Sequence, residues 1–111
     1  MAIDQDEILY DETSQKLRDK LVDILGSEYV YYNPPQSVKL HYPCIRFILN
    51  GIRKGSADDR GYLKHRNYTI TLIHKDPDNL IVDDILDMPL CTFERSYIAD
   101  NFYHFVFTKY I

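Results

Sequence analysis

Three imidazoles and two thiols are the side chains of this sequence best suited to hold a transition metal. His41 and Cys44 are separated by two residues, whereas His74, Cys91 and His104 are spread along the rest of the chain. Structural zinc sites combine closely spaced pairs of such ligands, and this spacing matches none of them. We therefore expect no metal site. Both cysteines lie in apolar or aromatic runs, which is typical of free, buried thiols.

A divalent-metal nuclease is a second chemical possibility, because Pro77-Asp78 is followed by an acid, Glu94. Nucleases of this kind also need a lysine two residues after the second acid, to hold the attacking water. Ser96 occupies that position here. Asp78 is also explained as an acidic residue near a helix N-terminus. The nuclease remains the least favoured of three functional alternatives.

Other catalytic signatures are missing from the sequence. The segment 54–61 (Lys-Gly-Ser-Ala-Asp-Asp-Arg-Gly) lacks the spacing of a phosphate-binding loop, and its two aspartates would repel a phosphate. The chain contains no Gly-x-Ser-x-Gly segment, and neither cysteine has an activating neighbour in sequence. These observations predict a protein that is not an enzyme and needs no cofactor.

Charge is distributed unevenly along the chain. Acids dominate residues 1–28 and 76–101. Residues 53–66, in contrast, contain only two acids and five bases: Arg53, Lys54, Arg60, Lys64 and Arg66. Such a basic segment can be a solvated loop, can contact the acidic face of a neighbouring subunit, or can bind nucleic acid through phosphates. The net charge of -4 and the isoelectric point near 5.4 disfavour tight nucleic-acid binding.

The stretch 67–87 predicts a strand that leads directly into a capped helix. Residues 68–73 are mostly aromatic and β-branched, and Tyr68, Ile70 and Leu72 alternate with threonines. Asp76-Pro77-Asp78 then has the residue types of a helix start, which predicts a helix from Pro77 to about Asp87. An apolar stripe along this helix would face the core, and three acids would lie on the opposite face: Asp83, Asp84 and Asp87.

The remaining elements follow from hydrophobic periodicity. One helix is expected in the amphipathic region that opens with a capping box at Asp4 and Glu7; its signal is strongest over 13–25, and Gly26 would end it in the left-handed conformation. Strands are expected over 29–32, 43–53, 62–75, 90–97 and 102–111, with Gly51 marking a bulge or a strand end, a loop over 36–42 and an exposed, mobile loop over 54–61. The order α-β-β-β-α-β-β predicts an α+β domain in two layers, a mostly antiparallel sheet of about five strands with both helices on one face.

The 111 residues are enough for one domain with its own core. No stretch is long and apolar enough to span a membrane, and the acidic N-terminus differs from a secretory signal, so we expect a soluble protein that folds inside the cell. The ten tyrosines favour strand faces and protein contacts. We select three of them as candidate buried anchors of a subunit contact: Tyr29, Tyr31 and Tyr103.

Several segments together resemble a family of short phage proteins encoded among head–tail joining and tail genes, the tail completion or tail terminator proteins. The likeness is carried by residues 68–79 (Tyr-Thr-Ile-Thr-Leu-Ile-His-Lys-Asp-Pro-Asp-Asn), 90–101 (Leu-Cys-Thr-Phe-Glu-Arg-Ser-Tyr-Ile-Ala-Asp-Asn), His104, Phe107-Thr108, Tyr32-Asn-Pro-Pro35, Leu40 and Tyr42-Pro-Cys-Ile45. It covers most of the chain from about Val30 onward.

The resemblance implies a structural role rather than a chemical one. Tail terminators of long-tailed phages are α+β proteins that form a hexameric ring, which caps the tail tube and docks to the head connector. By this likeness the partners would be other copies of the chain, the tail tube and the connector, with DNA passing through the ring unread and no membrane involved. The protein would reside in the tail or neck of the virion, after assembly in the host cytoplasm.

Overall fold

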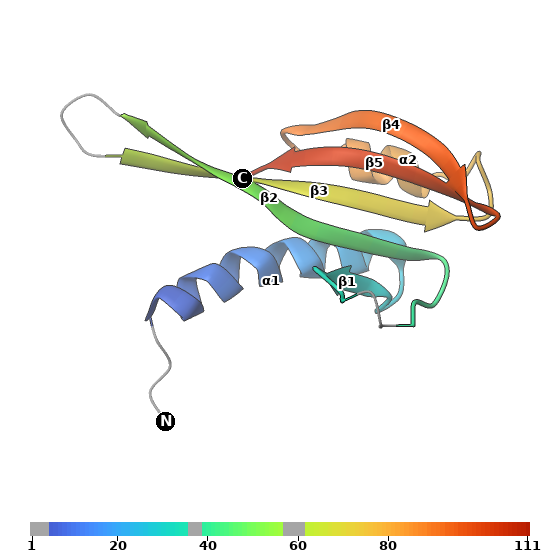
Figure 1. The fold of residues 1–111 in the computed structure, drawn as a ribbon, viewed down its shortest axis with the longest axis horizontal. Helices are drawn as coiled ribbons and strands as arrows, with labels where there is room; N and C mark the ends of the chain where they lie inside the picture. The colour runs from blue at the N-terminus through green and yellow to red at the C-terminus, as the bar shows by residue number, and fades with distance from the viewer. Residues whose placement is uncertain (1–4, 36–38, 57–61) are drawn as a thin grey trace.

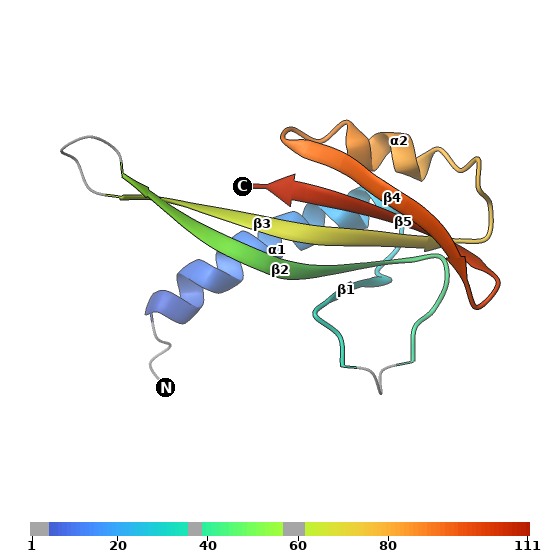
Figure 2. The same cartoon turned by 45° about the horizontal axis from the view of Figure 1, so that its top comes forward.

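The computed structural model of the protein describes residues 5–35, 39–56 and 62–111, with side chains described over 14–35, 39–52 and 66–111. Seven elements follow one another in the predicted order: α1 (Gln5–Leu25), β1 (Val30–Tyr32), β2 (Cys44–Ser56), β3 (Tyr62–His74), α2 (Ile81–Leu86), β4 (Cys91–Ala99) and β5 (Phe102–Tyr110). The strands form a single sheet in the order β1-β2-β3-β5-β4 (Figures 1 and 2). Every pair is antiparallel except β1 with β2. The predicted α+β class is confirmed.

The first helix begins at Gln5, within the predicted amphipathic region and ahead of its strongest signal over 13–25, and the expected cap at Asp4 lies outside the described residues. Leu17 and Leu21, one turn apart, are buried against the sheet. Gly26 has φ = 80° and donates its backbone N–H to the Val22 carbonyl at 2.8 Å, as predicted for a helix end. The chain then turns back into β1, an edge strand that pairs with β2 in parallel.

The two longest strands of the sheet, β2 and β3, are paired with each other. A register shift between Leu49 and Gly51 makes Asn50 the extra residue of a bulge, as the glycine had indicated. The predicted loop over 54–61 is wrong at its start, because residues 54–56 continue β2 and pair with 62–64 of β3. Residues 57–61 lie outside the described residues.

The second helix starts later than predicted. Asp76 accepts the Asp78 N–H through its side-chain Oδ1 at 2.9 Å, and the two form part of a turn rather than a helix start. Asn79 accepts the Val82 N–H through its Oδ1 at 3.2 Å, and α2 begins only at Ile81. The proposed dipole role of Asp78 is therefore wrong, since this residue lies outside the helix.

The final hairpin turns through Asp100 and Asn101, whose φ angles of 53° and 66° suit a two-residue turn between twisted strands. A register shift between Phe93 and Arg95 makes Glu94 a bulge in β4. Strict alternation along this strand would place Phe93 and Arg95 on the same face, but the bulge reverses the alternation after Phe93.

Both helices cover the same face of the sheet. The core contains Leu17 and Leu21 of α1, Ile85 of α2, Met88 and the residues that alternate on one face of the strands: Val30, Ile45, Phe47, Tyr68, Ile70, Leu72, Phe105 and Phe107. On the N-terminal side of Asn67, β3 is no longer paired with β5. There β2 and β3 continue as a two-stranded arm. Figures 1 and 2 show this arm extending past the other strands, at the end of the domain opposite the β4–β5 turn.

Candidate subunit interface

The predicted basic segment belongs to this two-stranded arm, which we call the β2–β3 arm (residues 52–56 and 62–66). In its register Arg53 lies opposite His65, and Lys54 lies directly opposite Lys64. Arg66 stands at the base of the arm, where its backbone exchanges hydrogen bonds with Ile111 at 2.9 and 3.3 Å. Arg60 lies outside the described residues. The arm therefore concentrates positive charge at an extended part of the sheet.

The predicted acidic residues lie together on α2. Asp83, Asp84 and Asp87 are all exposed, as the helical spacing predicted. Three leucines around this helix are exposed as well: Leu80 at 74%, Leu86 at 40% and Leu90 at 69%. The exposure of these leucines was not predicted from the sequence, although Leu80 and Leu90 lie beyond the two ends of α2. The surface around α2 is therefore both apolar and acidic, whereas the sequence had predicted only its acidic residues.

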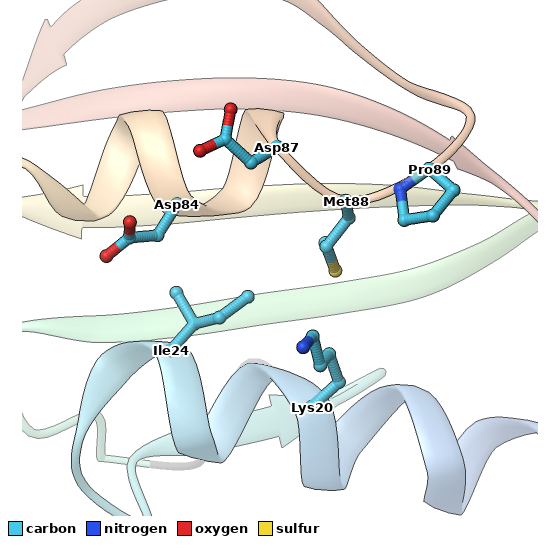
Figure 3. Close-up of a pocket in the computed structure, with 6 residues that line it drawn as sticks. All are labelled: Lys20, Ile24, Asp84, Asp87, Met88 and Pro89. Atoms are coloured by element: carbon cyan, nitrogen blue, oxygen red, sulfur yellow. The ribbon is translucent and has the colours of Figure 1, made fainter.

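A cleft of about 260 Å³ separates the two helices at this surface (Figure 3). Lys20 and Ile24 line it from α1, and Asp84, Asp87, Met88 and Pro89 line it from the α2 side. In Figure 3 the Met88 and Lys20 side chains project toward one another across the opening. The lining combines apolar side chains with charged side chains of both signs. Such a lining could accommodate an amphipathic side chain of another protein, with its apolar stem against the apolar residues and its charged end beside a residue of opposite charge.

A second, smaller cleft of about 180 Å³ lies between α1 and the first two strands. Its lining consists of Ser14, Gln15, Arg18, Tyr32 and Phe47. The Ser14 hydroxyl is buried and has no hydrogen-bond partner in the part of the chain that the structure describes. Gln15 donates to Asp19 on the outside of the helix at 2.8 Å. This lining offers no base close to the hydroxyl, so it supplies no activated nucleophile.

The three candidate tyrosines do not form one surface. Tyr29 stacks on His41 with ring centroids 5.0 Å apart, and the Tyr31 hydroxyl accepts the His41 backbone N–H at 3.2 Å. Both tyrosines thus hold the segment before β2 against β1. Tyr103 packs against the core and pairs in register with His74, at the far end of the sheet. These contacts are internal to the domain.

The potential metal and catalytic residues are likewise dispersed. In the ranges that the structure describes, no three histidine, cysteine or acidic side chains come together as a metal site would require. His74 accepts the Asp76 N–H through Nδ1 at 2.9 Å, and His104 stacks on Tyr97 at 4.7 Å. Glu94, the second acid of the nuclease alternative, accepts a hydrogen bond from Thr92 at 3.2 Å.

Both thiols are held in their protonated form. Burial raises the pKa of the Cys44 thiol to about 11, although the nearby Arg46 charge partly opposes this shift. Burial also raises the pKa of Cys91, which the Lys109 charge partly offsets. A reactive cysteine needs a lowered pKa, so neither residue has the environment of a nucleophile.

Compared with models of known protein families and with curated proteins, the chain gives no match. No helix in the described part of the chain is long and apolar enough to cross a membrane.

Proposed function

We propose that this protein is a structural assembly protein of a phage tail, which forms a ring that caps the tail tube and joins it to the head connector. The proposal rests on the resemblance of residues 30–108 to tail terminators together with one feature of the structure, the β2–β3 arm. This arm contains Arg53, Lys54 and Lys64 and extends past the other strands of the sheet (Figure 1). Such an arm is suited to contact with another molecule.

The domain also carries surfaces of different chemical character on different sides, which head-to-tail binding in a ring requires. Closed rings form when one surface of each copy binds a different surface of the next copy. Here the arm is basic, α2 is acidic, and β4 is an edge strand whose residues are almost all exposed. An exposed edge strand can pair with another chain. Such an arrangement supports head-to-tail association of identical copies.

The experiment that tests this function uses purified phage tails. Electron microscopy of tails that lack the protein, before and after its addition, should show a ring at the head-proximal end only after addition. Loss of the gene should yield tails of irregular length. Tails that bind no protein, together with unchanged tail length in the deletion, would exclude the proposed role.

A nucleic-acid-binding module is the second candidate, favoured by the Lys54–Lys64 register of the arm. Two opposed lysines could each contact a phosphate, and such binding weakens steeply as salt rises. The isoelectric point near 5.4 argues against it. Titration of a labelled DNA duplex over a salt series separates the two candidates, because the assembly protein should show no steep salt dependence.

A further inference from the structure

One face of the sheet is covered by no helix in the part of the chain that the structure describes, because α1 and α2 both pack on the other face. We call it the helix-free face. The strand register places these side chains on it: Cys44, Arg46, Ile48, Thr69, Thr71, Ile73, Thr92, Arg95, Tyr97, His104, Val106 and Thr108. These positions include two arginines and no acid. The helix-free face is therefore an open surface of basic character.

Four aromatic rings form a continuous strip along one end of this face. Tyr97 of β4 stacks on His104 of β5, with ring centroids 4.7 Å apart. Phe102, two residues before His104 on the same strand, stacks on Tyr42 at 4.3 Å, so this second contact spans the intervening strand β3. Tyr42 and Tyr97 remain 44% and 43% exposed. We call these four residues the aromatic strip. Exposed rings on an open sheet can stack on planar groups of a ligand.

Cationic side chains adjoin this strip from two directions. Lys75 Nζ lies 5.7 Å from the centroid of the Phe102 ring. Arg95 Cζ lies 5.9 Å from the centroid of the Tyr97 ring. A cation above an aromatic ring is attracted by the negative face of the ring. The strip thus combines planar rings with positive charge held close to them.

The two arginines of the helix-free face lie in one row across the sheet. The register joins Arg46 of β2 to Arg95 of β4 through two uncharged residues, Thr71 and Val106. Three strand spacings of about 4.8 Å separate the two backbones by about 14 Å. Both side chains are exposed, and neither guanidinium has an ion pair in the described ranges. This row runs beside the aromatic strip, two residues away along β4 and β5.

The acids that adjoin this face in sequence lie at its margins. Glu94, in the β4 bulge, accepts a hydrogen bond from Thr92 at 3.2 Å. Asp76 accepts the Asp78 N–H at 2.9 Å, and Asp100 lies in the turn between β4 and β5. The isoelectric point near 5.4 thus reflects acids on other surfaces, those of α2 among them.

We propose that the helix-free face binds single-stranded nucleic acid, with bases stacked on the aromatic strip and phosphates beside three cations: Arg46, Lys75 and Arg95. A single strand presents planar bases and regularly spaced negative charges in one molecule, and exposed rings flanked by cations match both. Every base has a planar face to stack, so binding should tolerate different sequences. This binding is independent of ring assembly, and it uses a surface other than the β2–β3 arm.

Other occupants match the helix-free face less well. A second copy of the same face would place arginines against arginines, and like charges at an interface disfavour association. An acidic peptide would neutralise the cations but would leave the exposed rings without a planar partner. Duplex DNA offers phosphates, yet its bases are stacked on one another and paired, so they cannot lie on the aromatic strip.

Fluorescence anisotropy with a labelled oligothymidylate tests the site in the full-length protein. A strand of about 15 nucleotides is comparable to the site of a single binding domain. The wild type should bind it at least tenfold more tightly than it binds a duplex of equal length. Equal affinity for the two, or a preference for the duplex, would overturn the proposed site.

Tyr97 tests the stacking contribution, because it is exposed on an edge strand and its replacement should leave the domain folded. Tyr97→Ala should weaken oligothymidylate binding about tenfold, whereas Tyr97→Phe keeps the ring and should bind as the wild type does. Circular dichroism checks the fold of both variants, and Tyr42→Ala provides a second, independent removal of a ring. Unchanged binding by both alanine variants would show that no base stacks on the strip.

The two arginines test the phosphate contacts. Each phosphate contact of a single strand contributes about 0.7 to the slope of log affinity against log salt, so Arg46→Gln/Arg95→Gln should reduce that slope by about 1.4. The matched control is Lys16→Gln/Lys20→Gln, which removes the same charge from exposed positions on α1, on the other side of the sheet. An equal reduction in both double variants would contradict a contact at the arginine row.

Three further outcomes would assign the binding elsewhere and overturn the site. Polyglutamate that displaces the strand as well as unlabelled oligothymidylate does would identify an acidic polypeptide as the occupant. Amide NMR shifts confined to residues 53–66 would move the contact to the β2–β3 arm. Self-association that Arg46→Gln/Arg95→Gln abolishes, with oligothymidylate binding unchanged, would make the face a contact between copies. None of these results bears on the ring at the tail end, which electron microscopy tests separately.

Discussion

Asn79 accepts the backbone N–H of Val82 through its side-chain Oδ1 at 3.2 Å, and it donates through Nδ2 to the Asp76 carbonyl at 2.7 Å. One amide side chain therefore joins the turn after β3 to the first turn of α2. This helix has only six residues, too few to be stable without support from its ends and its packing. The orientation of α2 and of its exposed residues thus depends on Asn79.

Replacing Asn79 by alanine should lower the free energy of unfolding by about 1 kcal/mol, because the first turn of α2 loses a capping acceptor. Asp78→Ala is the matched comparison. Its side chain lies before the helix and is exposed, so its removal should change stability by less than about 0.5 kcal/mol. Urea unfolding measures both, and a larger loss for Asp78→Ala would restore the helix start at Pro77.

The regular strands were predictable because their periodicity is local. Ile45 and Phe47 alternate with Cys44, Arg46 and Ile48 in the sequence, and the structure places the first two in the core. Cys44, on the helix-free face, is buried as well. A burial pattern with period two follows from the backbone of any strand, so it requires no knowledge of the partner strand.

The helix start was mispredicted because turns and caps use the same residues. Aspartate and proline favour both a helix N-terminus and an Asx turn, and here Asp76 closes the turn while Asn79 caps the helix. The Glu94 bulge had no local signal, since only the register against β5 reveals it. The exposure of Leu90 was equally hidden, because leucine normally predicts burial.

The buried Tyr68 hydroxyl is expected to lower the stability of the core. Its oxygen is buried and has no hydrogen-bond partner in the part of the chain that the structure describes. A buried polar group without a partner loses its hydration on folding and gains nothing in return. Tyr68→Phe should therefore raise the free energy of unfolding by about 1 kcal/mol. Tyr103→Phe, at a half-buried position, is the control and should leave stability nearly unchanged, and a destabilised Tyr68→Phe would show that the hydroxyl is bonded.

Lys109 anchors the segment that follows α2. Its Nζ donates to the Pro89 carbonyl at 2.6 Å and to the Tyr110 carbonyl at 2.9 Å, so it holds the segment after α2 against β5. Lys109→Met keeps the apolar stem but leaves both carbonyls without this donor. We expect a loss of about 1 to 2 kcal/mol in unfolding free energy. Lys75→Met, at an exposed position, should cost much less, and an equal loss in both variants would contradict the anchoring role.

The buried Cys44 thiol makes stability depend on alkaline pH. Its pKa rises from 9.0 to about 11 on burial, so between these values the folded protein holds a proton that the unfolded chain releases. Stability is therefore lost as pH rises through this range. Burial lowers the pKa of Lys109, which acts in the opposite direction, because the unfolded chain then binds the additional proton. The two effects must be separated by mutation.

The Cys44→Ala variant lacks the thiol, so its comparison with the wild type isolates the contribution of the thiol to the pH dependence of stability. From pH 8 to pH 10 the wild type should lose about 1 kcal/mol more of its unfolding free energy than the variant does, whatever constant cost the substitution itself carries. Urea unfolding at several pH values measures the two slopes. Cys91→Ala serves as a comparison, since its pKa is raised in the same direction. If Cys44→Ala loses stability as steeply as the wild type, the thiol does not titrate with a raised pKa, and other groups cause the alkaline loss.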